Sequence, residues 1–97
     1  MYQVRDNIPD QGFDGLKTQK LFVKPQTEVL LISLENGAEF PEHTSPRDAF
    51  LVMLEGKILF HINDQAYQLH KHQTFNFPAT VPYWINANMN SKFLIIR

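Results

Sequence analysis

Short apolar runs separated by turn residues are the feature that most limits the folds open to this chain. The run Lys57–Ile62 alternates, with Ile58, Phe60 and Ile62 on one face and the other three residues on the opposite face. Asn63–Asp64 follows directly, and both residues tolerate the left-handed backbone that a tight hairpin requires. An alternating run that ends in such a turn is typical of a strand in an antiparallel sheet.

The same pattern recurs along most of the chain, and no stretch keeps a helical period over three turns. Strands are predicted at Leu16–Val23, Thr27–Leu34, Phe50–Leu54, Lys57–Ile62, Ala66–Leu69, Thr74–Phe77, Pro82–Ile85 and Lys92–Ile96. About eight short strands in a chain of this length predict an all-β sandwich or closed barrel, because closure removes exposed sheet edges. Residues 1–15 are expected to form an irregular lead-in to a single domain at 16–97.

Composition excludes several classes of function. Net charge is −1 and the nine basic residues are scattered, which argues against a nucleic-acid partner. The absence of cysteine excludes a disulfide scaffold and a thiol nucleophile. The first residues contain no apolar signal sequence, and no apolar run is long enough to span a membrane. We therefore expect a cytoplasmic protein with no membrane partner.

Two stretches have the spacing of a known pair of motifs. The first runs from Gly37 to Gly56 and contains His43. It resembles the first motif of the cupin family, a Gly followed by His-x-His, then a Glu four residues on, then a closing Gly. Ser45 stands where that motif has its second His, and Ala49 stands where it has its Glu.

The second stretch resembles the second cupin motif, which has a Gly, then Pro-x-Gly, then a His. His72 stands at the first Gly, Pro78 at the Pro, Thr80 at the next Gly and Tyr83 at the His. The resemblance covers residues 27–97. It implies a small RmlC-like cupin, with a double-stranded β-helix, or jelly-roll barrel, of antiparallel strands.

The resemblance also implies a degenerate metal site, because only His43 remains of four ligands. A divalent metal takes about four to six protein and water ligands, and one His with a hydroxyl, a phenol and a methyl group does not supply them. We therefore expect no metal and no cofactor. A second His-x-His pattern, at His70 and His72, lies in the turn before the second motif and is interpreted as a solvated turn.

The candidate site therefore depends on His43 and Tyr83. If they face one pocket they can act as general base and general acid, although a buried His beside a buried Tyr is also a common way for two core polar groups to pair. The candidate ligand-binding residues are Ser45, Arg47, Ala49 and Met53. Arg47 follows Pro46 in the expected mouth loop and could hold an anion with two hydrogen bonds.

Three functions stay open from the sequence. The first is a metal-free cupin that binds a small molecule in the barrel or serves as an accessory protein. The second is a metal-independent isomerase or lyase on a small polar or sugar-like substrate, with His43 as base and Tyr83 as acid. The third is a degenerate metal-binding cupin. A homodimer is expected, with Leu16–Val23 as an edge strand available for pairing.

Overall fold

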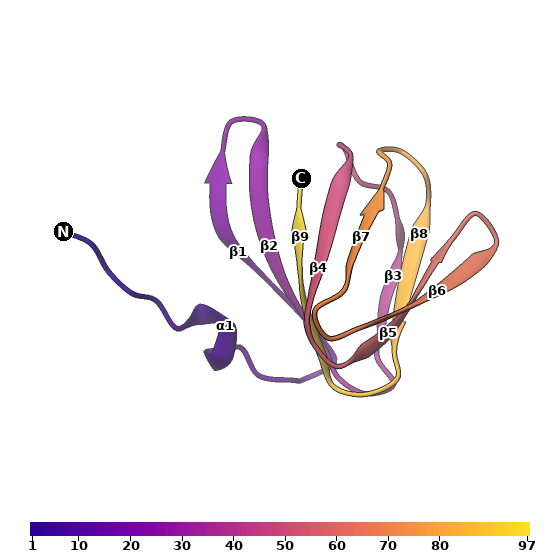
Figure 1. Ribbon diagram of the computed structural model, residues 1–97, viewed down its shortest axis with the longest axis horizontal. Helices are drawn as coiled ribbons and strands as arrows, with labels where there is room; N and C mark the ends of the chain where they lie inside the picture. The colour runs from indigo at the N-terminus through magenta and orange to yellow at the C-terminus, as the bar shows by residue number, and fades with distance from the viewer.

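The computed structural model describes all residues, 1–97, and contains nine strands and one short helix. The elements are α1 (Asn7–Asp10), β1 (Leu16–Lys24), β2 (Thr27–Leu34), β3 (Glu39–His43), β4 (Ala49–Glu55), β5 (Lys57–Ile62), β6 (Gln65–His70), β7 (Thr74–Phe77), β8 (Tyr83–Ala87) and β9 (Ser91–Ile96). Figure 1 shows the strands gathered in one body, with α1 beside it and the N-terminal residues before α1 extending away.

Two antiparallel sheets face each other. One has five strands in the order β1-β2-β9-β4-β7, and the other has four in the order β3-β8-β5-β6. Every pairing is antiparallel, and neighbours in each sheet are mostly distant in sequence. This is the predicted jelly-roll barrel, and the all-β fold class is confirmed.

The predicted strands lie close to the observed ones, and two elements, one strand and one helical turn, were not predicted. Thr27–Leu34, Lys57–Ile62 and Thr74–Phe77 match the observed bounds, and the other five differ by one or two residues at one or both ends. Strand β3 was not predicted. The lead-in was expected to be irregular, yet it includes the single helical turn of α1.

The core lies between the two sheets and is built by alternation. Along β4, Ala49, Leu51 and Met53 are buried while Phe50 is exposed; along β5, Ile58 and Phe60 are buried. Every strand except β1 contributes to this cluster of 16 buried residues, and its remaining members come from β2, β3 and β5 to β9. They are Ile32, Leu34, Phe40, Ile62, Leu69, Phe77, Tyr83, Ile85, Ala87, Phe93 and Ile95.

The lead-in is tied to the face of the five-stranded sheet that points away from the core. Lys92 Nζ donates a hydrogen bond to the carbonyl oxygen of Ile8 at 2.6 Å and lies over the ring of Phe13. Gln11 Nε2 donates to Ser33 Oγ at 2.8 Å. No helix of the structure is long and apolar enough to cross a membrane.

Candidate functional site

His43 and Tyr83 face each other across two neighbouring strands. His43 ends β3, Tyr83 begins β8, and the two are paired in the register of the four-stranded sheet. A bulge between Phe40 and His43 adjusts the last residues of β3. Tyr83 is only 1% exposed, whereas His43 is half-buried. The pair therefore joins the core to the open end of the barrel.

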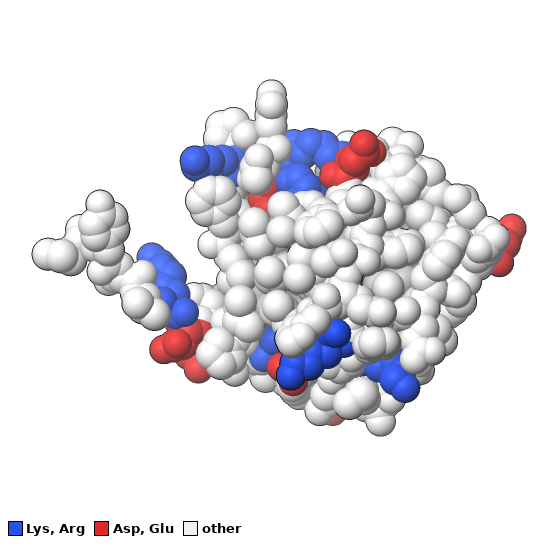
Figure 2. Space-filling view, in the orientation of Figure 1, with Lys and Arg blue, Asp and Glu red and all other residues white.

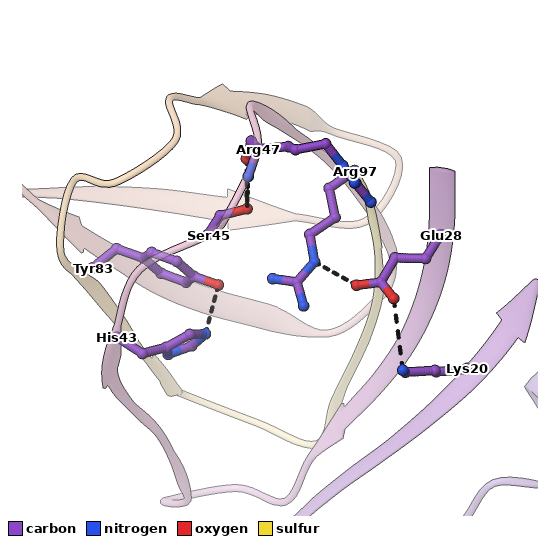
Figure 3. A network of polar contacts seen from close by, with 7 residues as sticks. All are labelled: Lys20, Glu28, His43, Ser45, Arg47, Tyr83 and Arg97. Atoms are coloured by element: carbon purple, nitrogen blue, oxygen red, sulfur yellow. Dashed lines mark hydrogen bonds and ion pairs between the residues drawn. The ribbon is translucent and has the colours of Figure 1, made fainter. Parts of the chain in front are cut away.

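Hydrogen bonds define the orientation of the His43 ring. Its Nδ1 lies 2.7 Å from the carbonyl oxygen of Pro41, which can only accept, so Nδ1 carries a hydrogen. In the neutral ring Nε2 is then an acceptor, and the Tyr83 hydroxyl 2.9 Å away donates to it (Figure 3). Both nitrogens of the ring are therefore satisfied within the chain.

Aromatic rings surround the phenol of Tyr83. Phe60 stacks on it with 5.0 Å between centroids, Phe77 lies tilted at 4.6 Å, and Phe40 packs at 6.0 Å. Burial among these rings raises the pKa of Tyr83 to about 12, although the positive charge of Arg97 acts in the opposite direction. The phenol is therefore neutral near pH 7 and acts as a hydrogen-bond donor.

Ser45 is buried, but its hydroxyl is used within its own loop. Its Oγ donates to the carbonyl oxygen of Arg47 at 2.5 Å, and the Arg47 backbone N–H reaches back to it at 3.4 Å (Figure 3). The carbonyl oxygen of Ser45 accepts from the N–H of Thr80 at 2.9 Å. Ser45 thus connects the loops of the two motifs, and its hydroxyl is not free for a ligand in this geometry.

The other candidate ligand-binding residues lie in different surroundings. Ala49 and Met53 point into the core from β4, and Met53 is fully buried and paired in register with Phe93. Arg47 is exposed in the loop before β4. The structure therefore brings Ala49 near the open end, buries Met53 below it, and leaves Arg47 at the rim.

Glu28 and Arg97 were not predicted as site residues. Arg97 Nε donates to Glu28 Oε1 at 2.7 Å, and both side chains are largely buried at the open end. Arg97 first, and then Lys20 and Arg47, hold the pKa of Glu28 below its usual value, against the effect of burial. The alternation along β9 could have indicated that Arg97 faces inward, because Phe93 and Ile95 do so and Arg97 follows in the same phase.

The residues at the open end do not fit a metal. His43 is the one imidazole, its Nε2 accepts from Tyr83, and the phenol is neutral. The Ser45 hydroxyl is bonded to its own loop. No three His, Cys, Asp or Glu side chains cluster anywhere in the chain in a way that could hold an ion. The Glu28 carboxylate at this end is paired with Arg97, so the free donors are fewer than the carboxylates and imidazoles that divalent metals prefer.

The backbone supports the motif alignment at the positions where the family has glycine. Gly37 and Gly56 have φ of 88° and 87°, and the residues aligned with two further glycines, His72 and Thr80, have φ of 72° and 69°. Residues other than glycine rarely adopt this left-handed backbone conformation. His72 and Thr80 adopt it nevertheless, which indicates that the two turns keep the shape expected from the motif. His72 lies in an exposed turn, where its N–H donates to the carbonyl oxygen of Met53.

Comparison with known proteins agrees with this alignment. Residues 30–96 match the family model described as a cupin domain. A conserved protein of unknown function from Streptococcus pyogenes superposes with a TM-score of 0.86 at 23% identity, over 99% of this chain and 86% of that one. An RmlC-like cupin from Desulfovibrio desulfuricans gives 0.84 at 18% identity, over 98% and 95%. KdgF from a Halomonas species gives 0.77 at 15% identity, over 84% and 78%.

These matches define a class of protein, a small single-domain cupin barrel. The chain belongs to the cupin domain family. No curated protein sequence matches it significantly. These three structural neighbours are each below 25% identical, so they establish the fold alone.

Proposed function

We propose that this chain is a metal-independent cupin that binds a small organic molecule at the open end of its barrel, next to the His43–Tyr83 pair. The observation that carries the proposal is the 2.9 Å hydrogen bond between Tyr83 and Nε2 of His43. By the motif alignment these two residues stand at two of the family's four ligand positions. The Tyr83 hydroxyl oxygen can still accept a hydrogen bond from an organic ligand, whereas Nε2 of His43 is already bonded and is not free to hold an ion.

The packing of the barrel favours a small ligand that approaches from the open end. Aromatic rings fill the interior beside Tyr83, and the principal surface hollows are lined by neither His43 nor Tyr83. His43 is half-buried and Arg97 keeps 17% of its side chain exposed. Solvent therefore reaches both His43 and Arg97 at the mouth. An accessory role without catalysis is compatible with the same binding site.

A second candidate is an isomerase or lyase that uses His43 as base and Tyr83 as acid on a small polar or sugar-like substrate. The direct contact of the two side chains favours it, because proton transfer needs groups within hydrogen-bond reach. The pKa of Tyr83, about 12, opposes it, because an acid suited to neutral pH has a pKa nearer 7. Binding without catalysis is therefore the better-supported function.

Thermal unfolding of untagged protein tests the proposal, with small alcohols, polyols, amides, sugars and carboxylates added singly, each with and without EDTA. At least one class should raise the melting temperature of the wild type, unaffected by EDTA. The shift should be lost in Tyr83→Phe and retained in Tyr67→Phe, which changes an exposed tyrosine. The absence of any shift, or one abolished by EDTA, would contradict the proposal.

We also propose a cytoplasmic homodimer. Strand β1 is the edge of the five-stranded sheet, and Phe22 and Val23 on it are 46% and 60% exposed. A long edge strand with exposed apolar side chains is a surface that proteins normally cover. The lack of cysteine is compatible with a reducing compartment.

A further inference from the structure

Glu28 and Arg97 are direct cross-strand neighbours that face the interior of the barrel. The N–H of Glu28 donates to the carbonyl oxygen of Arg97 at 2.6 Å, and the N–H of Arg97 donates back at 3.0 Å. On β2, Ile32 faces the core, and Glu28 lies four residues before it on the same face of the strand. The ion pair therefore lies at the rim of the apolar core, with both side chains on its inner side.

The pair leaves part of the Arg97 guanidinium free. Only Nε is bonded to Glu28, and neither terminal nitrogen has a hydrogen-bond partner in the chain. No fully buried side-chain nitrogen is left unpaired, so solvent reaches these two nitrogens. Figure 3 shows this end of the guanidinium turned toward the Tyr83 hydroxyl and His43. Glu28 thus fixes the guanidinium of Arg97 so that its two terminal nitrogens are directed toward the His43–Tyr83 pair.

The position of Ala49 gives this guanidinium room. Phe50 is paired with Ile96 in the antiparallel register of β4 and β9, so Ala49 and Arg97 are the next residues on the two strands. By the motif alignment Ala49 stands where metal-binding cupins have their Glu. A fixed positive charge therefore lies beside a position that no longer carries a carboxylate.

The local charge is positive although the chain as a whole is not. The net charge of the chain is −1, yet Lys20, Arg47 and Arg97 act together on the single carboxylate of Glu28. Asp48 also lies in the mouth loop, where its Oδ1 accepts from the N–H of Ala79. Figure 2 shows Lys and Arg atoms gathered along the upper edge of the molecule, with acidic atoms beside them. Such an excess raises the local concentration of anions.

We propose that the ligand is a small carboxylic acid whose carboxylate is held by the two terminal nitrogens of Arg97, with the rest of the molecule against Tyr83 and His43. This rests on the proposed small-molecule function and adds the class of ligand and its anchoring residue. A planar guanidinium edge matches the two oxygens of a carboxylate. Glu28 stays beside the guanidinium, so a monoanion is favoured over the more highly charged phosphate.

Calorimetric titration tests the inference with two monoanions, acetate and propionate, their neutral amides, and inorganic phosphate. The carboxylates should bind the wild type, and the amides should not. Arg97→Gln should weaken carboxylate binding about tenfold or more, as expected for loss of a charged hydrogen bond. Lys24→Gln is the matched control, because it removes an exposed cation at the same end, above Phe22, and should bind as the wild type does.

Two further variants keep the test decisive if Arg97→Gln does not fold. Glu28→Gln retains Arg97 and removes the competing carboxylate, so carboxylates should bind at least as tightly as to the wild type. Glu28→Gln/Arg97→Gln removes the ion pair as a unit and should lose binding. Weaker binding in Glu28→Gln, unchanged binding in Arg97→Gln or in the double variant, or a preference for phosphate would overturn the inference. Binding of neutral molecules alone, lost in Tyr83→Phe, would overturn it and leave the proposed function standing.

Discussion

The ring of Tyr83 lies nearly parallel to the ring of Phe60, with 7° between their planes and 5.0 Å between their centroids. The same tyrosine donates its hydroxyl hydrogen to His43. One side chain is therefore both a packed member of the core and a polar group of the candidate site. Substitutions can separate these two roles.

Tyr83→Phe should cost much less stability than Tyr83→Ala. The first keeps the ring against Phe60 and Phe77 and removes one hydrogen bond, which is worth about 1 kcal/mol. The second removes a buried ring and should cost about 3–5 kcal/mol. Urea unfolding followed by circular dichroism measures both. Equal losses in the two variants would show that the hydroxyl, rather than the ring, dominates.

Stability should fall at alkaline pH through Tyr83. Its pKa is raised from 10.0 to about 12 in the fold, so between these values the unfolded chain loses a proton that the folded chain keeps. Deprotonation therefore favours unfolding, and the free energy of unfolding falls by about 1.4 kcal/mol per pH unit over that window. Well below pH 10 Tyr83 is protonated in both states, so it does not contribute to the pH dependence of stability.

The measurement is the difference between wild type and Tyr83→Phe in urea unfolding from pH 8 to 11.5. Subtraction cancels the titration of Tyr2, Tyr67 and the lysines, which both proteins share. The advantage of the wild type should fall as the pH rises above 10 and should reverse in sign before pH 11.5. A difference that stays constant would show that Tyr83 ionises in the fold as it does in the unfolded chain.

Gly56→Ala should be strongly destabilising. Gly56 has a φ of 87°, and an added methyl group would collide with backbone and side-chain atoms of Asn90 and Ser91. Gly37 is the matched control, because its φ is 88° but no atom lies within 4 Å of the added carbon. Gly37→Ala should cost about 1 kcal/mol and Gly56→Ala clearly more. Equal melting temperatures for the two variants would contradict this geometry.

A homodimer predicts a mass near twice 11.3 kDa in sedimentation at micromolar concentration. Val23→Lys, on the exposed edge strand, should shift the equilibrium toward monomer. Met89→Lys changes a residue of similar exposure in the loop before β9 and should leave the dimer intact. A monomeric wild type, or a dimer unaffected by Val23→Lys, would exclude pairing through β1.

The sequence predicted the fold well because alternation and turn residues act locally. Lys57–Ile62 and its Asn63–Asp64 turn have the predicted form, and both turn residues are left-handed. Strand β3 was missed because Pro41 lies in its middle, which argues against a strand. The structure resolves this, since β3 is an edge strand and the missing N–H of a proline is tolerated there.

The candidate site was predictable only in part. The motif spacing paired His43 with Tyr83, and the structure brings them together in register. The Glu28–Arg97 pair could not be found in this way, because it depends on which distant strands become neighbours in the sheet. For Ser45 the motif predicted the position in the site. It could not predict that the hydroxyl bonds to the carbonyl oxygen of Arg47, because this depends on the conformation of the loop.

The most direct test of the central claim is elemental analysis of untagged protein, purified without chelators, beside His43→Ala prepared in the same way. The claim is that His43 and Tyr83 are bonded to each other at two positions that the cupin motifs reserve for metal ligands. It predicts transition-metal contents far below one equivalent per chain, with no difference between the two proteins. One equivalent of a transition metal in the wild type, absent from His43→Ala, would contradict it.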